Sequence, residues 1–238
     1  MLEVLYENPD VTPADGIRLP PKIRSRHGGD FALLRGTSLY SNFVITLDGI
    51  VELGDPTVSS GSAISDRNED DRFVMGLLRA FAEFILVGAG TFNSEPLHAW
   101  TAESIFPALA DNFAQLRREL GLPVKPTLLV ATRSGDINRK HAAFNAQPVE
   151  LIPDVTALPA GLVLTEGGPR LMGSLGGRID EVFMTHSPAL AGRAGPERLG
   201  MLEGFEFPPT ELLRHRLLSV RRAGSFLFTR YQRVAIEH

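Results

Sequence analysis

The sequence lacks cysteine altogether and is poor in lysine and tryptophan, with three lysines and one tryptophan among its 238 residues. The absence of cysteine excludes disulfides, thiolate metal sites and a cysteine nucleophile. No apolar run approaches the roughly 20 residues that a membrane-spanning helix needs. Residues 1–10 lack the basic flank and the apolar core of a signal peptide. We therefore expect a cytoplasmic protein with no membrane partner.

Charge and motifs exclude further classes of function. The net charge of −4 gives no broad attraction to nucleic acid. The basic residues are nearly all arginine, which favours planar, bidentate recognition of oxyanions. The six histidines are scattered and form no HExxH pair, so no metal site is predicted. A G-x-S-x-G elbow for serine hydrolysis is also missing. These exclusions favour a small-molecule ligand.

Strands and helices alternate along most of the chain. This alternation predicts an α/β fold with a largely parallel sheet, closed by a C-terminal antiparallel β-hairpin around Ala223–Gly224. Residues 1–35, rich in proline, are expected to form an extended arm, and residues 36–238 a single domain. The expected strands are 39–47, 84–87, 127–131, 149–152, 162–165, 179–186, 212–220 and 226–236, and one expected helix covers 105–120.

An earlier helix is expected to begin at Ser65 or Asp66, after a Gly/Ser-rich loop over residues 54–65. Phe73, Leu77 and Phe81 recur there at helical spacing and form its buried stripe. We expect the polar remainder of this helix to be its solvated face.

The stretch from Val163 to Met172 has the pattern of a phosphate-binding turn, because a buried strand is followed by two glycines and a helix. Gly167 and Gly168 let the backbone approach a ligand closely, and Pro169 suits the first turn of a helix. A tight strand-to-helix turn without a ligand is the alternative interpretation.

A second glycine turn follows the strand over 84–87. Gly88-Ala89-Gly90 resembles the start of a dinucleotide fingerprint, but Asn93 takes the place of the third glycine and no helix pattern follows directly. The full Rossmann motif is therefore absent. What remains is a turn that presents backbone N–H groups and the hydroxyl group of Thr91.

Polar residues also follow other strands. Arg133, between Thr132 and Ser134, suits the 2′-phosphate of NADP, although a solvated loop arginine explains it equally well. Period-two alternation places Asn42, Thr46 and Asp48 on one side of the first strand of the domain. The alternative interpretation of Asp48 is that it is only a turn residue, because aspartate is common before glycine in turns. Because ligands bind at the carboxyl ends of strands in open α/β sheets, these loops predict one site.

With these motifs in order, the chain resembles the pyrimidine reductase of riboflavin biosynthesis, namely the C-terminal domain of the bifunctional deaminase-reductase and its stand-alone relatives. The resemblance covers about residues 36 to 235. It implies a dihydrofolate-reductase-like fold. The matching segments are Ser41–Gly49, Leu78–Ala80, Ile85–Thr91, Thr165–Pro169, Ile179–Glu181 and Ser187–Pro188.

The resemblance implies a homodimer that transfers a hydride from NADPH to the ring-opened ribosylamino sugar of a pyrimidine 5′-phosphate. It places Asn42, Thr46 and Asp48 at the nicotinamide and substrate, and we hypothesise that Asp48 orients the substrate or relays the proton. The implied NADP-binding residues are Gly88, Gly90, Thr91, Glu166, Gly167, Gly168, Pro169, Arg170 and Leu171, with Thr132 and Arg133 near the adenosine end.

Two departures concern the substrate. Bifunctional members carry a lysine where this chain has Asn42. The stand-alone relatives resemble this chain at that position. The family's arginine after an Asp-Pro segment is missing, because Glu95-Pro96-Leu97 is followed here by His98-Ala99-Trp100. Two alternatives therefore stay open: the same fold and cofactor with another substrate, such as a dihydropterin, or a non-catalytic NADP-binding protein.

Overall fold

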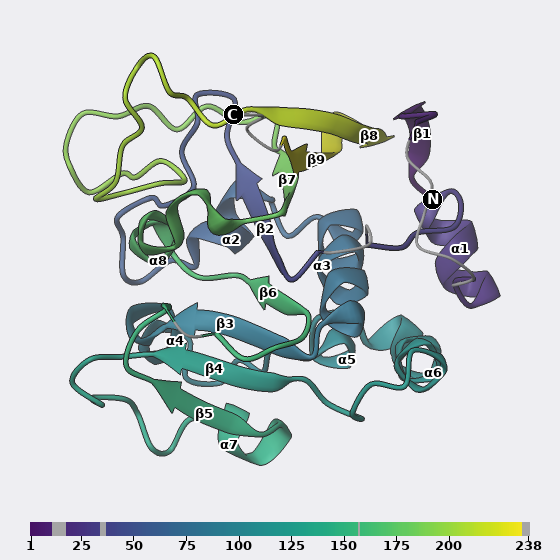
Figure 1. Ribbon diagram of the computed structural model, residues 1–238, viewed down its shortest axis with the longest axis horizontal. Coiled ribbons are helices and arrows are strands. Elements are labelled where there is room, and N and C mark those ends of the chain that lie inside the picture. Colours follow the sequence, from purple (N-terminus) through teal and green to yellow (C-terminus); the bar gives the residue numbers. More distant parts are fainter. Residues whose placement is uncertain (11–17, 34–36, 157, 235–238) are drawn as a thin grey trace.

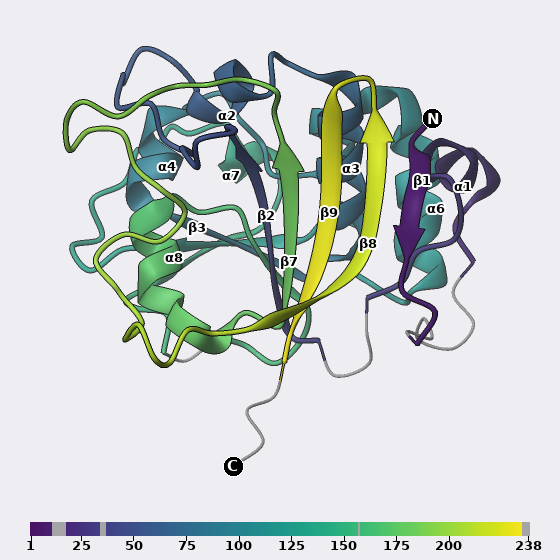
Figure 2. The same ribbon diagram turned by 90° about the horizontal axis from the view of Figure 1, so that it is seen from above.

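The computed structural model describes residues 1–10, 18–33, 37–156 and 158–234, and its core is a nine-stranded sheet. The strand order is β1-β8-β9-β7-β2-β6-β3-β4-β5 (Figures 1 and 2). The strands are β1 (Glu3–Glu7), β2 (Leu39–Ile45), β3 (Phe84–Gly88), β4 (Thr127–Ala131), β5 (Val149–Ile152), β6 (Val163–Thr165), β7 (Glu181–His186), β8 (His215–Ala223) and β9 (Phe226–Arg233).

Strands β7, β2, β6, β3, β4 and β5 run parallel to their neighbours, while β9, β8 and β1 add antiparallel pairs at one edge. This confirms the predicted mostly parallel α/β sheet with a C-terminal hairpin. The predicted end of that hairpin, residues 235 and 236, lies outside the described residues. Among the described residues, no helix is long and apolar enough to span a membrane.

The helices lie on both sides of the sheet. Alternation along β2 sends Tyr40 into one core cluster, with α3, and Leu39 into the other, with α8. Figure 2 shows α3 behind β9 and β8. The α-helices are α1 (Pro21–His27), α2 (Ser60–Ile64), α3 (Glu69–Phe81), α4 (Ala89–Ser94), α5 (Ala102–Ile105), α6 (Ala110–Glu119), α7 (Ala143–Ala146) and α8 (Pro169–Leu175), with 3-10 turns η1 (Pro107–Leu109) and η2 (Gly176–Arg178).

The start of α3 differs from the prediction. Ser65 caps the end of the short helix α2, so the expected loop over 54–65 is partly helical. Asp66 and Arg67 then take positive φ angles of 50° and 51°, which a helix cannot contain. Asn68 begins α3 instead, because its side-chain oxygen accepts the backbone N–H groups of Asp70 and Asp71 at 2.8 and 3.1 Å.

The helix predicted over 105–120 is divided into α5, η1 and α6. Phe106, which precedes Pro107, has the non-helical angles φ −136° and ψ 75°. The residue before a proline is pushed out of the helical region, so the chain turns there. The apolar spacing nevertheless continues after the break, where Leu109, Phe113 and Leu116 are buried.

The N-terminal segment joins the sheet and also contains a helix that the sequence did not predict. β1 pairs with β8, and α1 begins with a proline and ends at Gly28, which has a φ of 82°. Leu2 and Ile23 are fully buried. The predicted boundary between residues 35 and 36 lies outside the described residues.

Candidate active site

The predicted loops follow neighbouring parallel strands and meet at one edge of the sheet. Thr165 of β6 pairs with Ser41 of β2 on one side and with Leu86 of β3 on the other. Gly88 of β3 pairs with Ala131 of β4. The turns that carry Asp48, Glu166, Gly88 and Thr132 therefore leave the carboxyl ends of adjacent strands, in the order β2, β6, β3 and β4.

The two glycine turns lie close to each other. A Cβ atom on Gly168 would lie 3.5 Å from the Oγ1 atom of Thr91, whereas one on Gly88 or Gly90 would meet no described atom within 4 Å. A helix does follow Gly88 directly, contrary to the prediction, since α4 begins at Ala89. With six residues, α4 is too short to show a helical period in the sequence. The two turns thus lie side by side, with open space at the Cβ positions of Gly88 and Gly90.

The other residues of the predicted phosphate-binding turn include both packed and exposed positions. The side chain of Leu171 lies over Gly167, so any Cβ at Gly167 would clash with it. Pro169 is buried in the first turn of α8, and Arg170 is exposed. A larger residue at position 167 would therefore displace the side chain of Leu171, and Gly168 faces the neighbouring turn.

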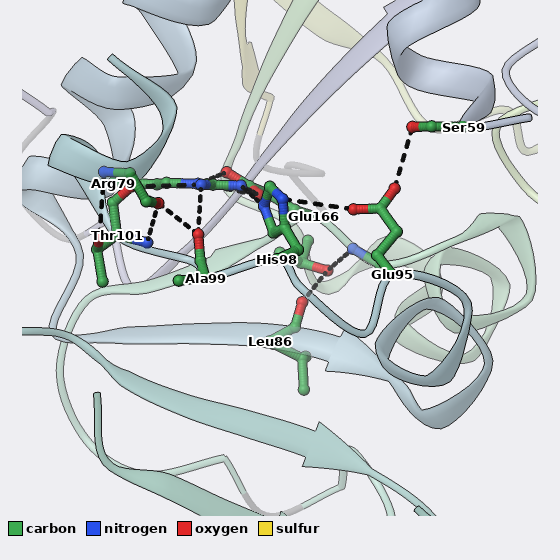
Figure 3. Close-up of polar contacts among 11 residues, drawn as sticks. Ser59, Arg79, Leu86, Glu95, His98, Ala99, Thr101 and Glu166 are labelled. Atoms are coloured by element: carbon green, nitrogen blue, oxygen red, sulfur yellow. Dashed lines mark hydrogen bonds and ion pairs between the residues drawn. The ribbon is translucent and has the colours of Figure 1, made fainter. Parts of the chain in front are cut away.

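The carboxylate of Glu166 is bound by a buried arginine of α3 (Figure 3). The Nη2 atom of Arg79 lies 2.6 Å from Oε2 of Glu166, and its Nε donates to Oε1 at 3.0 Å. The Nη1 group donates to the carbonyl oxygens of Ala99 and Thr101 at 3.3 Å. Arg79 therefore joins α3, the β6–α8 turn and the segment before α5.

A neutral histidine extends this network. Burial, and then the charges of Arg79 and His141, lower the pKa of His98 to about 3. Nη2 of Arg79 lies 3.1 Å from Nε2 of His98, so Nε2 acts as acceptor and the proton is assigned to Nδ1, 3.5 Å from Oε2 of Glu95. Ser59 donates to the other oxygen of Glu95 at 3.0 Å. An uncharged ring thus occupies the segment where the resemblance expects an arginine.

The structure joins Thr46 to Asp48 and places Asn42 elsewhere on β2. The carboxylate of Asp48 accepts hydrogen bonds from the Thr46 hydroxyl at 2.7 Å and from the backbone N–H groups of Ala191 and Gly192 at 3.1 and 2.6 Å. These bonds, that of Thr46 first, lower the pKa of Asp48 to about 2. Asp48 is therefore an anion that ties the loop after β7 to the end of β2, which suits positioning better than proton transfer.

Asn42 is 7% exposed and lines a cavity of about 30 Å³ between α3 and strands β7, β8 and β9.

Thr132 and Arg133 follow the end of β4, which is separated from β2 by β6 and β3 in the sheet. The Thr132 hydroxyl accepts the N–H group of Gly135 at 3.1 Å, and Arg133 is exposed near Asp154, whose pKa it helps to lower. Arg133 is thus free to meet a ligand but has a competing carboxylate nearby.

Sequence reasoning missed one acidic residue, Asp71, in the first turn of α3. It belongs to the polar residues of this helix, which were expected to lie mostly on the solvated face, yet it is 4% exposed. Burial raises its pKa to about 6, because an ionised carboxylate is disfavoured there, and the charge of Glu166 adds to this effect. Val74 and Leu78 follow Asp71 by three and seven positions, so they share its face of the helix. This spacing was the available signal that Asp71 is buried.

Residues 37–227 match the family described as the RibD C-terminal domain. The chain belongs to this family. The match confirms the resemblance predicted from the sequence. A search of curated proteins finds no match to the chain.

Three solved structures share the fold of this RibD C-terminal domain. RibD of Acinetobacter baumannii superposes with a TM-score of 0.61 at 15% identity, over 84% of this chain and 59% of that one. The deaminase/5-amino-6-(5-phosphoribosylamino)uracil reductase of Thermotoga maritima superposes with a TM-score of 0.58 at 17% identity, over 83% of this chain and 57% of that one. A pyrimidine reductase-like protein from Corynebacterium diphtheriae superposes with a TM-score of 0.55 at 15% identity, over 84% of this chain and 92% of that one. The chain thus spans less than two thirds of the first two proteins.

Proposed function

We propose that the protein is an NADPH-dependent reductase of a pyrimidine intermediate of the riboflavin type, 5-amino-6-(5-phosphoribosylamino)uracil or its diaminopyrimidine precursor. The observation that carries this proposal is that the Gly168 turn lies beside Thr91, in a chain that belongs to the RibD C-terminal domain family. The names of the Thermotoga and Corynebacterium structures support the same reaction class.

The glycine turns fit a dinucleotide pyrophosphate. Side chains at Gly88 and Gly90 would fill the open space above the β3 turn, and a side chain at Gly168 would extend into the space beside Thr91. Backbone N–H groups in such turns bind phosphate without needing a cation. Arg133, exposed beyond β4, would contact the 2′-phosphate, which favours NADPH over NADH. We infer that Gly88, Gly90, Thr91 and Gly168 hold the pyrophosphate.

The cofactor would supply a hydride, and the chain would orient the substrate and provide a proton. The Arg79–Glu166 pair fixes the β6–α8 turn beside β2. Asp48, ionised and hydrogen bonded on three sides, holds the loop after β7 next to the same strand end. These residues therefore shape the space where the substrate and the nicotinamide would meet.

A second candidate is the reduction of a heterocycle that carries no phosphate. The neutral His98 and the carboxylate of Glu95 occupy the segment where the family resemblance expects a cationic arginine. A phosphate monoester carries close to two negative charges at neutral pH, so this segment favours a substrate without a phosphate group. Dihydrofolate is a suitable test compound for this candidate.

The test is NADPH oxidation by the purified protein with the ribosylaminouracil phosphate, its diaminopyrimidine precursor or dihydrofolate. Oxidation with either of the first two supports the main proposal, and oxidation with dihydrofolate alone supports the second. Tight NADPH binding without oxidation of any compound would identify a non-catalytic binding protein. We also propose a homodimer, for which light scattering should give twice the chain mass of 25.9 kDa.

A further inference from the structure

A buried carboxyl group lies beside the proposed substrate site, on the side of the sheet that α3 covers. Asp71 interacts there with the hydroxyl groups of Thr185, on β7, and Ser65, at the end of α2, and all three residues are buried. Thr185 pairs with Val44 of β2 and also lines the cavity that contains Asn42. A single hydroxyl group therefore connects Asp71 with this cavity beside β2.

Asp71 has no described cation as a partner. Its burial and the negative charge of Glu166 favour the protonated form, and they outweigh the two hydroxyl groups, which favour the ionised form. As the pH rises, Asp71 therefore keeps its proton up to a pH of about 6, where an ordinary aspartate is already ionised. The charged groups on the surrounding elements engage other partners: Glu69 and Asp70 pair with Arg26 of α1, Glu166 pairs with Arg79, and His186 of β7 bonds to Thr229.

The other titratable groups at this edge are poor proton donors. Asp48 is a stabilised anion, with three hydrogen-bond donors on its carboxylate. The carboxylate of Glu166 is bound by Arg79, and His98 is neutral with its Nε2 atom facing the same arginine. Reduction of a C=N bond needs a proton on nitrogen as well as a hydride on carbon, so the site needs a different acid.

We propose that Asp71 holds the proton consumed in the reduction and passes it to the substrate through the hydroxyl group of Thr185. This inference rests on the proposed reductase function. The bound cofactor would supply the hydride for the substrate carbon, while the Thr185 hydroxyl group gives its proton to the substrate nitrogen and receives the proton of the Asp71 carboxyl group. Asp71 is left as a carboxylate, which water reprotonates before the next turnover.

A first test needs no substrate. The 13C resonance of the Asp71 carboxyl group, assigned by its loss in Asp71→Asn, is titrated in the complexes with NADPH and with NADP+. The nicotinamide ring of NADP+ is positively charged, so the titration midpoint should be lower with NADP+ by at least about half a pH unit. Equal midpoints in the two complexes would place Asp71 away from the ring and overturn the proposal.

Calorimetry on the same samples separates this result from the proposed function. If neither nucleotide binds, the reductase proposal fails and the role of Asp71 fails with it. If both bind and the midpoints agree, only the role of Asp71 fails.

The second test is the pH profile of the reduction with whichever of the three compounds is turned over. Wild-type kcat should fall about tenfold per pH unit above pH 6, and Asp71→Asn should be at least about 100-fold slower at pH 5.5 with a flat profile. Its Kd for NADPH should stay within twofold of wild type. Asp70→Asn, next on the same turn, is the control and should keep the wild-type profile. A wild-type profile in Asp71→Asn would refute the relay.

Discussion

Replacing Arg79 by methionine should strongly destabilise the protein. Arg79 is 1% exposed and Glu166 is 8% exposed, so the substitution leaves a buried carboxylate without its cation. Breaking a buried ion pair in this way costs about 3–5 kcal/mol. Glu166→Gln keeps an acceptor for the guanidinium group and should cost about 2 kcal/mol. The double variant Arg79→Met/Glu166→Leu removes both groups and should cost less than the single changes Arg79→Met and Glu166→Leu together.

The assay is urea unfolding followed by two probes. Trp100, the sole tryptophan, is 2% exposed and its ring centroid lies 4.7 Å from that of His98, so its fluorescence reports on this network. Circular dichroism reports on the whole chain, and coincident transitions justify a two-state treatment. A loss below about 1 kcal/mol in Arg79→Met, or strictly additive losses in the double variant, would show that the pair does not stabilise the fold as argued.

Three further predictions concern single acidic and basic residues. Because folding raises the pKa of Asp71 to about 6, wild-type stability should fall by about 2 kcal/mol as the pH rises from 4 to 8, and urea unfolding of Asp71→Asn should show no such fall. Arg133→Gln should weaken NADPH binding about tenfold in calorimetry but leave NADH binding unchanged, and equal losses for both would remove the 2′-phosphate contact. Asp48→Asn should lower kcat in steady-state assays with NADPH affinity nearly intact, and unchanged turnover would exclude Asp48 from the mechanism.

Most of the sheet could be predicted from the sequence because its strands are short apolar runs bounded by glycine and proline. β4 and β5 begin and end at the predicted residues, and β2, β3, β6 and β7 differ by two residues or fewer at each end. Burial on both faces makes such runs apolar throughout, so they are recognisable without long-range information. The order of the turns along the carboxyl edge then follows from parallel pairing.

The missed features depend on contacts that no local pattern contains. The partners Arg79 and Glu166 are 87 positions apart, so Glu166 was assigned to the cofactor without knowledge of its arginine. Asp71 was assigned to solvent because the buried hydroxyl of Thr185 comes from a distant strand. The start of α3 was placed too early, because the positive φ angles of Asp66 and Arg67 are not a preference of those residue types.

The central claim is that the two neighbouring glycine turns bind NADPH, and calorimetry on Gly168→Val tests it most directly. A Cβ on Gly168 lies 3.5 Å from Thr91, so the branched side chain would fill the space between the turns, and NADPH binding should be lost while the circular dichroism spectrum is unchanged. Gly177→Val is the matched control, because its Cβ also lies 3.5 Å from a neighbouring side chain but after the end of α8. The control should bind NADPH like the wild type, and wild-type binding in Gly168→Val would contradict the account.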